Sequence, residues 1–217
     1  MRATGTMLGD PHTREIVLTA ILSGQQVVNA IPVEDIIGLL NSAKIRFVLV
    51  GAHGMAGWRD RARATEDVDL VVMAKHVKKA TKLLVAAYAN LDAEDHEVVV
   101  RLRDHATQKV AVDLMKTNQP LYAAAFQHTV ATTIKGQSCL IPTLEMSLAM
   151  KFAPMISLTR EDDKKHIDAS DFIRMVKVNS TIDLETLAQL GDVVYPGGGK
   201  EIVEKVRQVR AGERLQL

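Results

Sequence analysis

The chain has 217 residues, of which 47% are hydrophobic and 24% charged, and 27 Lys and Arg residues nearly balance 26 Asp and Glu residues. These values are typical of a globular protein and exclude disordered, collagen-like and disulfide-framework chains. Because the net charge is only +1, binding of a nucleotide or a nucleic acid would need a local group of basic residues.

The single cysteine, Cys139, excludes an intrachain disulfide and a cysteine-based zinc cluster, which fits a reducing compartment. The first residues lack the apolar segment of a secretory signal, and no stretch approaches eighteen consecutive apolar residues. We therefore expect a cytoplasmic protein without membrane contact.

The first half of the chain predicts alternating helices and strands. Helices are expected where a proline or a capping residue precedes an apolar periodicity, and strands where β-branched residues run up to a glycine or a turn. The predicted helices are 11–23, 33–42, a turn at 53–58 and 75–88, and the predicted strands are 46–50 and 67–73.

Four more strands are predicted before the character of the chain changes at Pro142. They are 97–103 and 109–115, which form a hairpin, and 129–134 and 138–141, with a short helix at 121–126 before the last two. Beyond Pro142 only helical periodicity is found, at 144–152, 162–176, 184–190 and 201–209. We therefore predict a sheet domain with N-terminal helices over residues 1–141 and a helical region packed on it over residues 142–217.

Two acids stand at the start of the apolar strand 67–73. Residues two apart in a strand project from the same face, so Asp67 and Asp69 would hold their carboxylates side by side and repel each other. A divalent cation such as Mg²⁺ would relieve this repulsion. The alternative is structural: one acid caps the strand in solvent, and the other pairs with Arg61 or Arg63.

A third acid, Asp113, lies in a strand whose other central residues are apolar, where an unpaired charge would be costly. If this strand lies beside the first, three carboxylates converge, as metal-assisted phosphoryl chemistry requires. Phosphatases of the haloacid dehalogenase type fit poorly, because their D-x-D follows the apolar strand, whereas here Asp67 and Asp69 precede the apolar run.

Together these features resemble the DNA polymerase β-type nucleotidyltransferase superfamily. The shared pattern is a strand, Gly51 and Ala52, the motif R-x-T-x-D-x-D over residues 63–69, and Asp113 on a later strand. The motif is similar to that of the AbiEii branch, whose members include toxins of bacterial toxin–antitoxin and phage-defence systems.

The second half of the chain extends the resemblance, which covers residues 47–172. Members of the branch follow the sheet domain with a helix that carries a lysine and then with a cluster of basic and acidic residues. The matching residues here are Lys151, Arg160, Lys164, Lys165, Asp168 and Asp171. The resemblance implies an α+β nucleotidyltransferase fold, with a mixed β-sheet flanked by helices and a helical C-terminal region.

The resemblance also implies roles for individual residues. Asp67 and Asp69 would bind Mg²⁺ or Mn²⁺, and Asp113 would complete the metal site and deprotonate or orient the acceptor. The implied nucleotide-binding residues are Gly51, Ala52, Arg63, Thr65, Lys151, Arg160 and Lys165. For Arg160 and Lys165, an ion pair with Asp168 or Asp171 explains the residues equally well. Ala52 departs from the pattern, because many members place serine or a second glycine there.

The implied reaction is a Mg²⁺-dependent transfer of a nucleoside monophosphate from an NTP to an acceptor hydroxyl on RNA, such as tRNA, or on protein. A toxin of this type would have a cognate antitoxin as partner. Two alternatives remain open: a catalytically inactive nucleotide-binding or protein-interaction module, which Ala52 favours, and a transferase that acts on a small molecule such as an antibiotic. The sequence does not choose the acceptor, the base or the oligomeric state.

Overall fold

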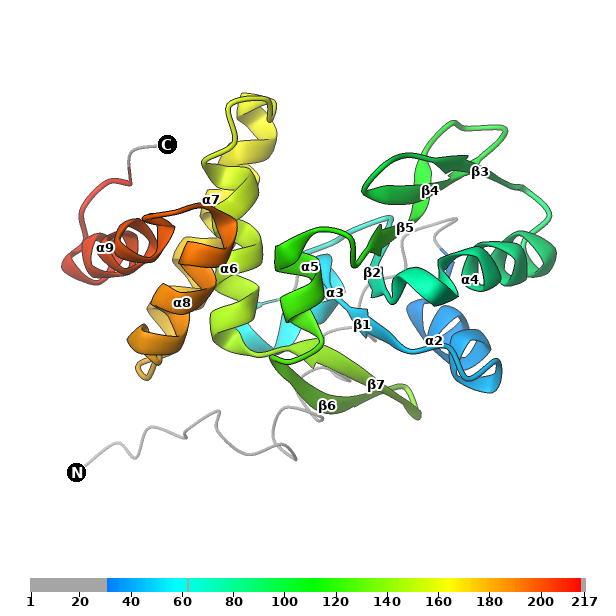
Figure 1. Ribbon diagram of the computed structural model, residues 1–217, viewed down its shortest axis with the longest axis horizontal. Coiled ribbons are helices and arrows are strands. Elements are labelled where there is room, and N and C mark those ends of the chain that lie inside the picture. Colours follow the sequence, from blue (N-terminus) through cyan, green and yellow to red (C-terminus); the bar gives the residue numbers. More distant parts are fainter. Residues whose placement is uncertain (1–30, 62, 216–217) are drawn as a thin grey trace.

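The computed structural model describes residues 31–61 and 63–215 (Figure 1). The helix expected at 11–23 lies outside the described residues. Helix α2, Val33–Ser42, forms where the sequence predicts it and turns Val33, Ile36, Ile37 and Leu40 into the core at helical spacing.

The main sheet has five strands in the order β1-β2-β5-β4-β3. Its strands are β1 Phe47–Leu49, β2 Val68–Val72, β3 Leu91–Asp95, β4 Val99–Asp104 and β5 Val110–Lys116. Strands β2 and β5 pair in parallel, whereas the other neighbouring pairs are antiparallel. The predicted mixed sheet is therefore confirmed.

The alternation of side chains along β2 and β5 separates two cores. From β2, Val68, Leu70 and Val72 pack in the core that includes α2 and α4, Ala74–Ala87. Val71 belongs to the opposite core, which the C-terminal helices share. Because side chains alternate along a strand, Asp69 projects to the same side as Val71, toward the C-terminal helices.

The opposite core is built by helices that follow the sheet. They are α6 Leu144–Met155, α7 Asp162–Val178, α8 Leu184–Val194 and α9 Gly198–Ala211, and they lie together on one side of the sheet in Figure 1. In the part of the chain that the structure describes, no strand follows Pro142, as predicted.

Shorter elements connect the sheet to these helices. The predicted turn after Gly51 is helix α3, Gly51–Gly54, followed by a 3-10 turn, Ala56–Trp58. Helix α5, Pro120–Ala125, precedes a separate antiparallel pair of strands, β6 Thr129–Ile134 and β7 Gln137–Pro142. None of the helices described in the structure is both long enough and apolar enough to cross a lipid bilayer.

Candidate active site

The three acids that the sequence singles out meet at one place on the sheet. Asp69 of β2 and Asp113 of β5 are direct Cα partners in the parallel pairing, and Asp67 lies just before β2. All three line a cleft of about 940 Å³ between the sheet and helices α6 and α7. The cleft is therefore the candidate active site.

The carboxylates perturb one another. Burial raises the pKa of Asp69 to about 7, and the nearby charges of Asp67 and Asp113 contribute in the same direction. Burial also raises the pKa of Asp113, although Arg101 opposes the shift from β4 with its Nε 3.4 Å from Asp113 Oδ1. In the absence of a cation, Asp69 therefore takes up its proton as the pH falls through about 7.

Gly51 holds the turn between β1 and α3 against Asp69. Its φ of +60° is a left-handed conformation, and a Cβ added there would lie only 1.8 Å from Asp69 Oδ2. The N–H of Val50 donates to the carbonyl oxygen of Asp69 at 2.9 Å. Only glycine therefore lets the backbone approach the carboxylate this closely. The adjacent Ala52 is buried and does not line the cleft.

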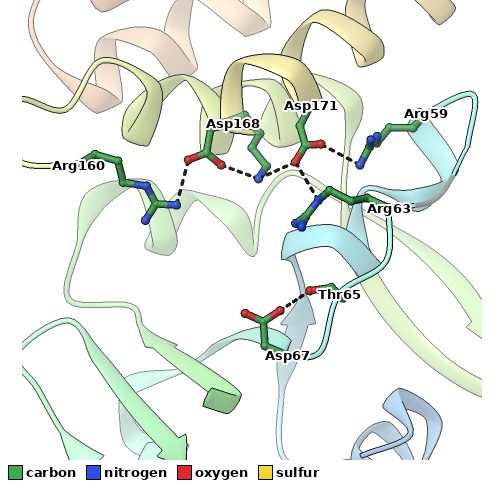
Figure 2. A network of polar contacts seen from close by, with 8 residues as sticks. Arg59, Arg63, Thr65, Asp67, Arg160, Asp168 and Asp171 are labelled. Atoms are coloured by element: carbon green, nitrogen blue, oxygen red, sulfur yellow. Dashed lines mark hydrogen bonds and ion pairs between the residues drawn. The ribbon is translucent and has the colours of Figure 1, made fainter. Parts of the chain in front are cut away.

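On the other side of the cleft, Lys151 of α6 bridges two acids of α7. Its Nζ lies 2.7 Å from Asp168 Oδ1 and 2.9 Å from Asp171 Oδ2. Arg160 contacts the other oxygen of Asp168 at 3.0 Å, as Figure 2 shows. The predicted ion pair of Arg160 with one of these acids therefore forms, and Lys151 and Arg160 both still line the cleft.

Two arginines from the loop after Trp58 complete this network. Arg59 Nη1 lies 2.8 Å from Asp171 Oδ1, and Arg63 Nε lies 3.8 Å from Asp171 Oδ2 (Figure 2). Arg63 and Thr65 line the cleft, and the Thr65 hydroxyl donates a hydrogen bond to Asp67. The structure thus gathers Arg63, Thr65, Lys151 and Arg160 around the carboxylates.

Lys165 does not line the cleft. It lines a separate pocket beside α9, and its Nζ lies 3.6 Å from Asp162, one helical turn before it. The predicted ion pair of Lys165 with Asp168 or Asp171 is therefore wrong. Those two acids pair with Lys151 and the arginines instead.

Sequence analysis did not single out three residues of the site. Arg101 lies directly opposite Asp113 in the β4–β5 pairing, so the register of the predicted hairpin is the signal that would identify it. Tyr122 of α5 lines the cleft, and burial raises the pKa of its phenol, with Asp69 and Asp113 adding to the shift. Arg59 gave no signal, because a basic segment is usually exposed.

The donor set fits a hard divalent cation in its chemistry. It offers carboxylate oxygens whose mutual repulsion a cation would relieve, and the buried Asp113 Oδ1 has the ion pair with Arg101 but no hydrogen bond among the described residues. Within residues 31–61 and 63–215, however, no three His, Cys, Asp or Glu side chains are already arranged to hold a metal ion. Asp67 and Asp113 would have to reorient from Thr65 and Arg101.

Comparison with known proteins identifies the fold. No protein-family model and no curated protein sequence matches the chain. A solved structure does: 88% of this chain superposes on 93% of an antigenic nucleotidyltransferase-like protein from Paracoccidioides brasiliensis, with a TM-score of 0.51 and 17% sequence identity. The fold is that of a nucleotidyltransferase-like protein.

Two further solved structures are similar over much of the chain. One is the lincosamide antibiotic adenylyltransferase LnuA bound to lincomycin, with 15% identity, a TM-score of 0.46, and coverage of 65% of this chain and 94% of that one. The other is ANT(2″)-Ia in complex with adenylyl-2″-tobramycin, with 10% identity, a TM-score of 0.47, and coverage of 82% and 94%.

Proposed function

We propose that this chain is a nucleotidyltransferase that moves a nucleoside monophosphate from an NTP to an acceptor hydroxyl and releases pyrophosphate. The observation that carries the proposal is the register pair Asp69 and Asp113, with Asp67 beside it, at the floor of a cleft that basic side chains line. The nucleotidyltransferase-like fold supports the same reaction class.

Asp67, Asp69 and Asp113 would hold Mg²⁺ or Mn²⁺. The bound cation would offset the charge of the triphosphate and stabilise the negative charge that develops during transfer. Asp113 lies on the strand beside Asp69 and would orient the acceptor hydroxyl and accept its proton.

The triphosphate would lie between the Gly51 turn and the basic residues of α6 and α7. The first N–H groups of a helical turn have no partner inside the helix, so those after Gly51 are suited to donate hydrogen bonds to a phosphate oxygen. Lys151 and Arg63 would offset the phosphate charge from across the cleft, and Arg160 would add its charge while it stays paired with Asp168. Ala52 would contribute only its N–H, where a serine would add a hydroxyl.

We further propose that the acceptor is RNA, such as tRNA, or protein, and that the chain is a toxin of the AbiEii type with a cognate antitoxin. Arg101, Arg103 and Lys164 line the cleft in addition to the residues assigned to the triphosphate, and their charge suits an anionic acceptor. The motif R-x-T-x-D-x-D at residues 63–69 supports the branch.

Label transfer tests the proposed reaction. The protein is incubated with an NTP labelled at the α-phosphate, Mg²⁺, and cellular RNA or protein, and a parallel sample receives label at the γ-phosphate. We expect only the α-label to enter the acceptor, and Asp69→Ala to abolish this transfer. Asp92→Ala on the exposed side of β3 is the matched control and should transfer normally. Equal labelling by wild type and Asp69→Ala would refute the proposal.

A further inference from the structure

The two carboxylate oxygens of Asp171 pair with different cations. Oδ1 contacts Arg59 at 2.8 Å, whereas Oδ2 contacts Lys151 at 2.9 Å and Arg63 at 3.8 Å. The Asp171 side chain is only 1% exposed, so its charge depends on these neighbours for compensation. One acid in the core thus joins three cations.

The three cations differ in their access to the cleft. The Arg63 side chain is 37% exposed and the Lys151 side chain 11% exposed, and both line the cleft. The Arg59 side chain is 5% exposed and does not line it. Figure 2 shows Arg59 and Arg63 reaching Asp171 from the same loop. The partners of Oδ2 can therefore meet a ligand, while the partner of Oδ1 cannot.

The backbone beside Arg59 is fixed in place. The indole of Trp58 donates to the carbonyl oxygen of Pro142 at 3.0 Å, and the Asn179 side chain donates to the carbonyl oxygen of Trp58 at 2.8 Å. The buried Trp58 thus connects the start of the loop to β7 and to the C-terminal end of α7. Arg59 is held where it is, next to Asp171.

A buried carboxylate that loses its counterions is strongly destabilising. If Lys151 and Arg63 were the only partners of Asp171, turning both toward a triphosphate would leave the acid uncompensated. We infer that Arg59 is a positioning residue that stays with Asp171, so that Lys151 and Arg63 are free to turn to the phosphates of the nucleotide. This inference rests on the proposed function.

Nucleotide affinity tests the inference. Binding of a non-hydrolysable NTP with Mg²⁺ is measured by calorimetry for the wild type, Arg59→Met and the double variant Arg59→Met/Asp171→Asn. Arg59→Met should weaken binding about tenfold, because Asp171 then retains Lys151 and Arg63. The double variant should regain most of the affinity, because the amide no longer needs a cation.

A purely structural role for Arg59 predicts a different pattern. Arg59→Met would then lower the melting temperature but leave the affinity of the folded protein unchanged, and that result would overturn the inference. Arg174→Met is the matched control, because Arg174 lies on α7 near Asp171 but pairs with the half-exposed Asp60 outside the cleft. It should bind the nucleotide as the wild type does.

A second readout needs no nucleotide and separates this inference from the proposed function. The rate at which the Lys151 amine is acylated, followed by mass spectrometry of the native protein, reports how tightly the network holds it. The rate should fall several-fold in Arg59→Met and recover in the double variant. Unchanged rates would overturn the inference even if nucleotide binds. If the Lys151 acylation rates change as expected but no nucleotide binds, the result would support the role of Arg59 as a partner of Asp171 and refute only the proposed function.

Discussion

Gly51 and Asp69 approach so closely that a single added carbon on the glycine would lie 1.8 Å from the carboxylate oxygen. Asp69 in turn lies beside Asp113 in the parallel pairing of β2 and β5. The turn after β1 therefore packs directly against the two neighbouring strands, and a side chain added at the glycine must displace the carboxylate.

Gly51→Ala should disrupt both folding and the site. The methyl group clashes with Asp69, and alanine is strained at a φ of +60°, so we expect the free energy of unfolding to fall by about 3 kcal/mol. Chemical denaturation measures this loss, and label transfer should fall with it.

Gly136→Ala separates the clash from the backbone strain. Gly136 also has a positive φ, +82°, but nothing lies within 4 Å of the Cβ that alanine would add. Its loss should be about 1 kcal/mol, from conformation alone. If the two variants lose equal stability, the close approach of Gly51 to Asp69 is not what constrains the glycine.

Asp69→Asn should make the cation-free protein more stable while it abolishes transfer. The folded pKa of Asp69, about 7, exceeds its ordinary value of 3.8, so folding disfavours the charged form. The resulting penalty grows as the pH rises from about 4 to about 7 and is complete above that range. With a chelator present, the variant should gain about 4 kcal/mol at about pH 8 and almost nothing at about pH 4.

Mg²⁺ should reverse this difference. At about pH 8 the cation binds the ionised carboxylates and should raise the melting temperature of the wild type, but not that of Asp69→Asn. The gain should shrink as the pH falls through about 7, because protons compete for Asp69. A melting temperature that Mg²⁺ raises equally in both proteins would place the bound cation elsewhere.

Cys139 should be unreactive in the folded protein. It is 7% exposed in the core beside the sheet, and burial raises the pKa of its thiol to about 12. At about pH 8 the native chain should therefore react with a thiol reagent far more slowly than the chain in denaturant. A native rate close to the denatured rate would mean that β7 opens readily.

The sequence predicted the elements whose apolar residues follow a clear period. Helix α2 and strand β2 were found in this way, because their buried side chains recur at helical or strand spacing. Strand β3 was missed, because only Leu91 is buried and the four residues after it are exposed. Its place at the sheet edge depends on pairing with β4, which local pattern does not encode.

The acids of the candidate site could be predicted because a charge in an apolar strand is conspicuous. Asp113 is such a charge, because the other central residues of its strand are apolar. Arg59 did not, because its burial depends on Asp171, a residue far along the chain that only the packing of α7 brings close. The family resemblance implies a nucleotide-binding role for Lys165, but this side chain lines a different pocket, beside α9.

The position of a bound cation tests the central claim most directly. Crystals grown with Mn²⁺ and a non-hydrolysable NTP would reveal the metal through its anomalous scattering. The account predicts a peak in contact with carboxylate oxygens of Asp67 and Asp69, with the triphosphate extending toward Lys151. A nucleotide bound in the cleft with no metal at these carboxylates, or a metal bound only elsewhere, would contradict it.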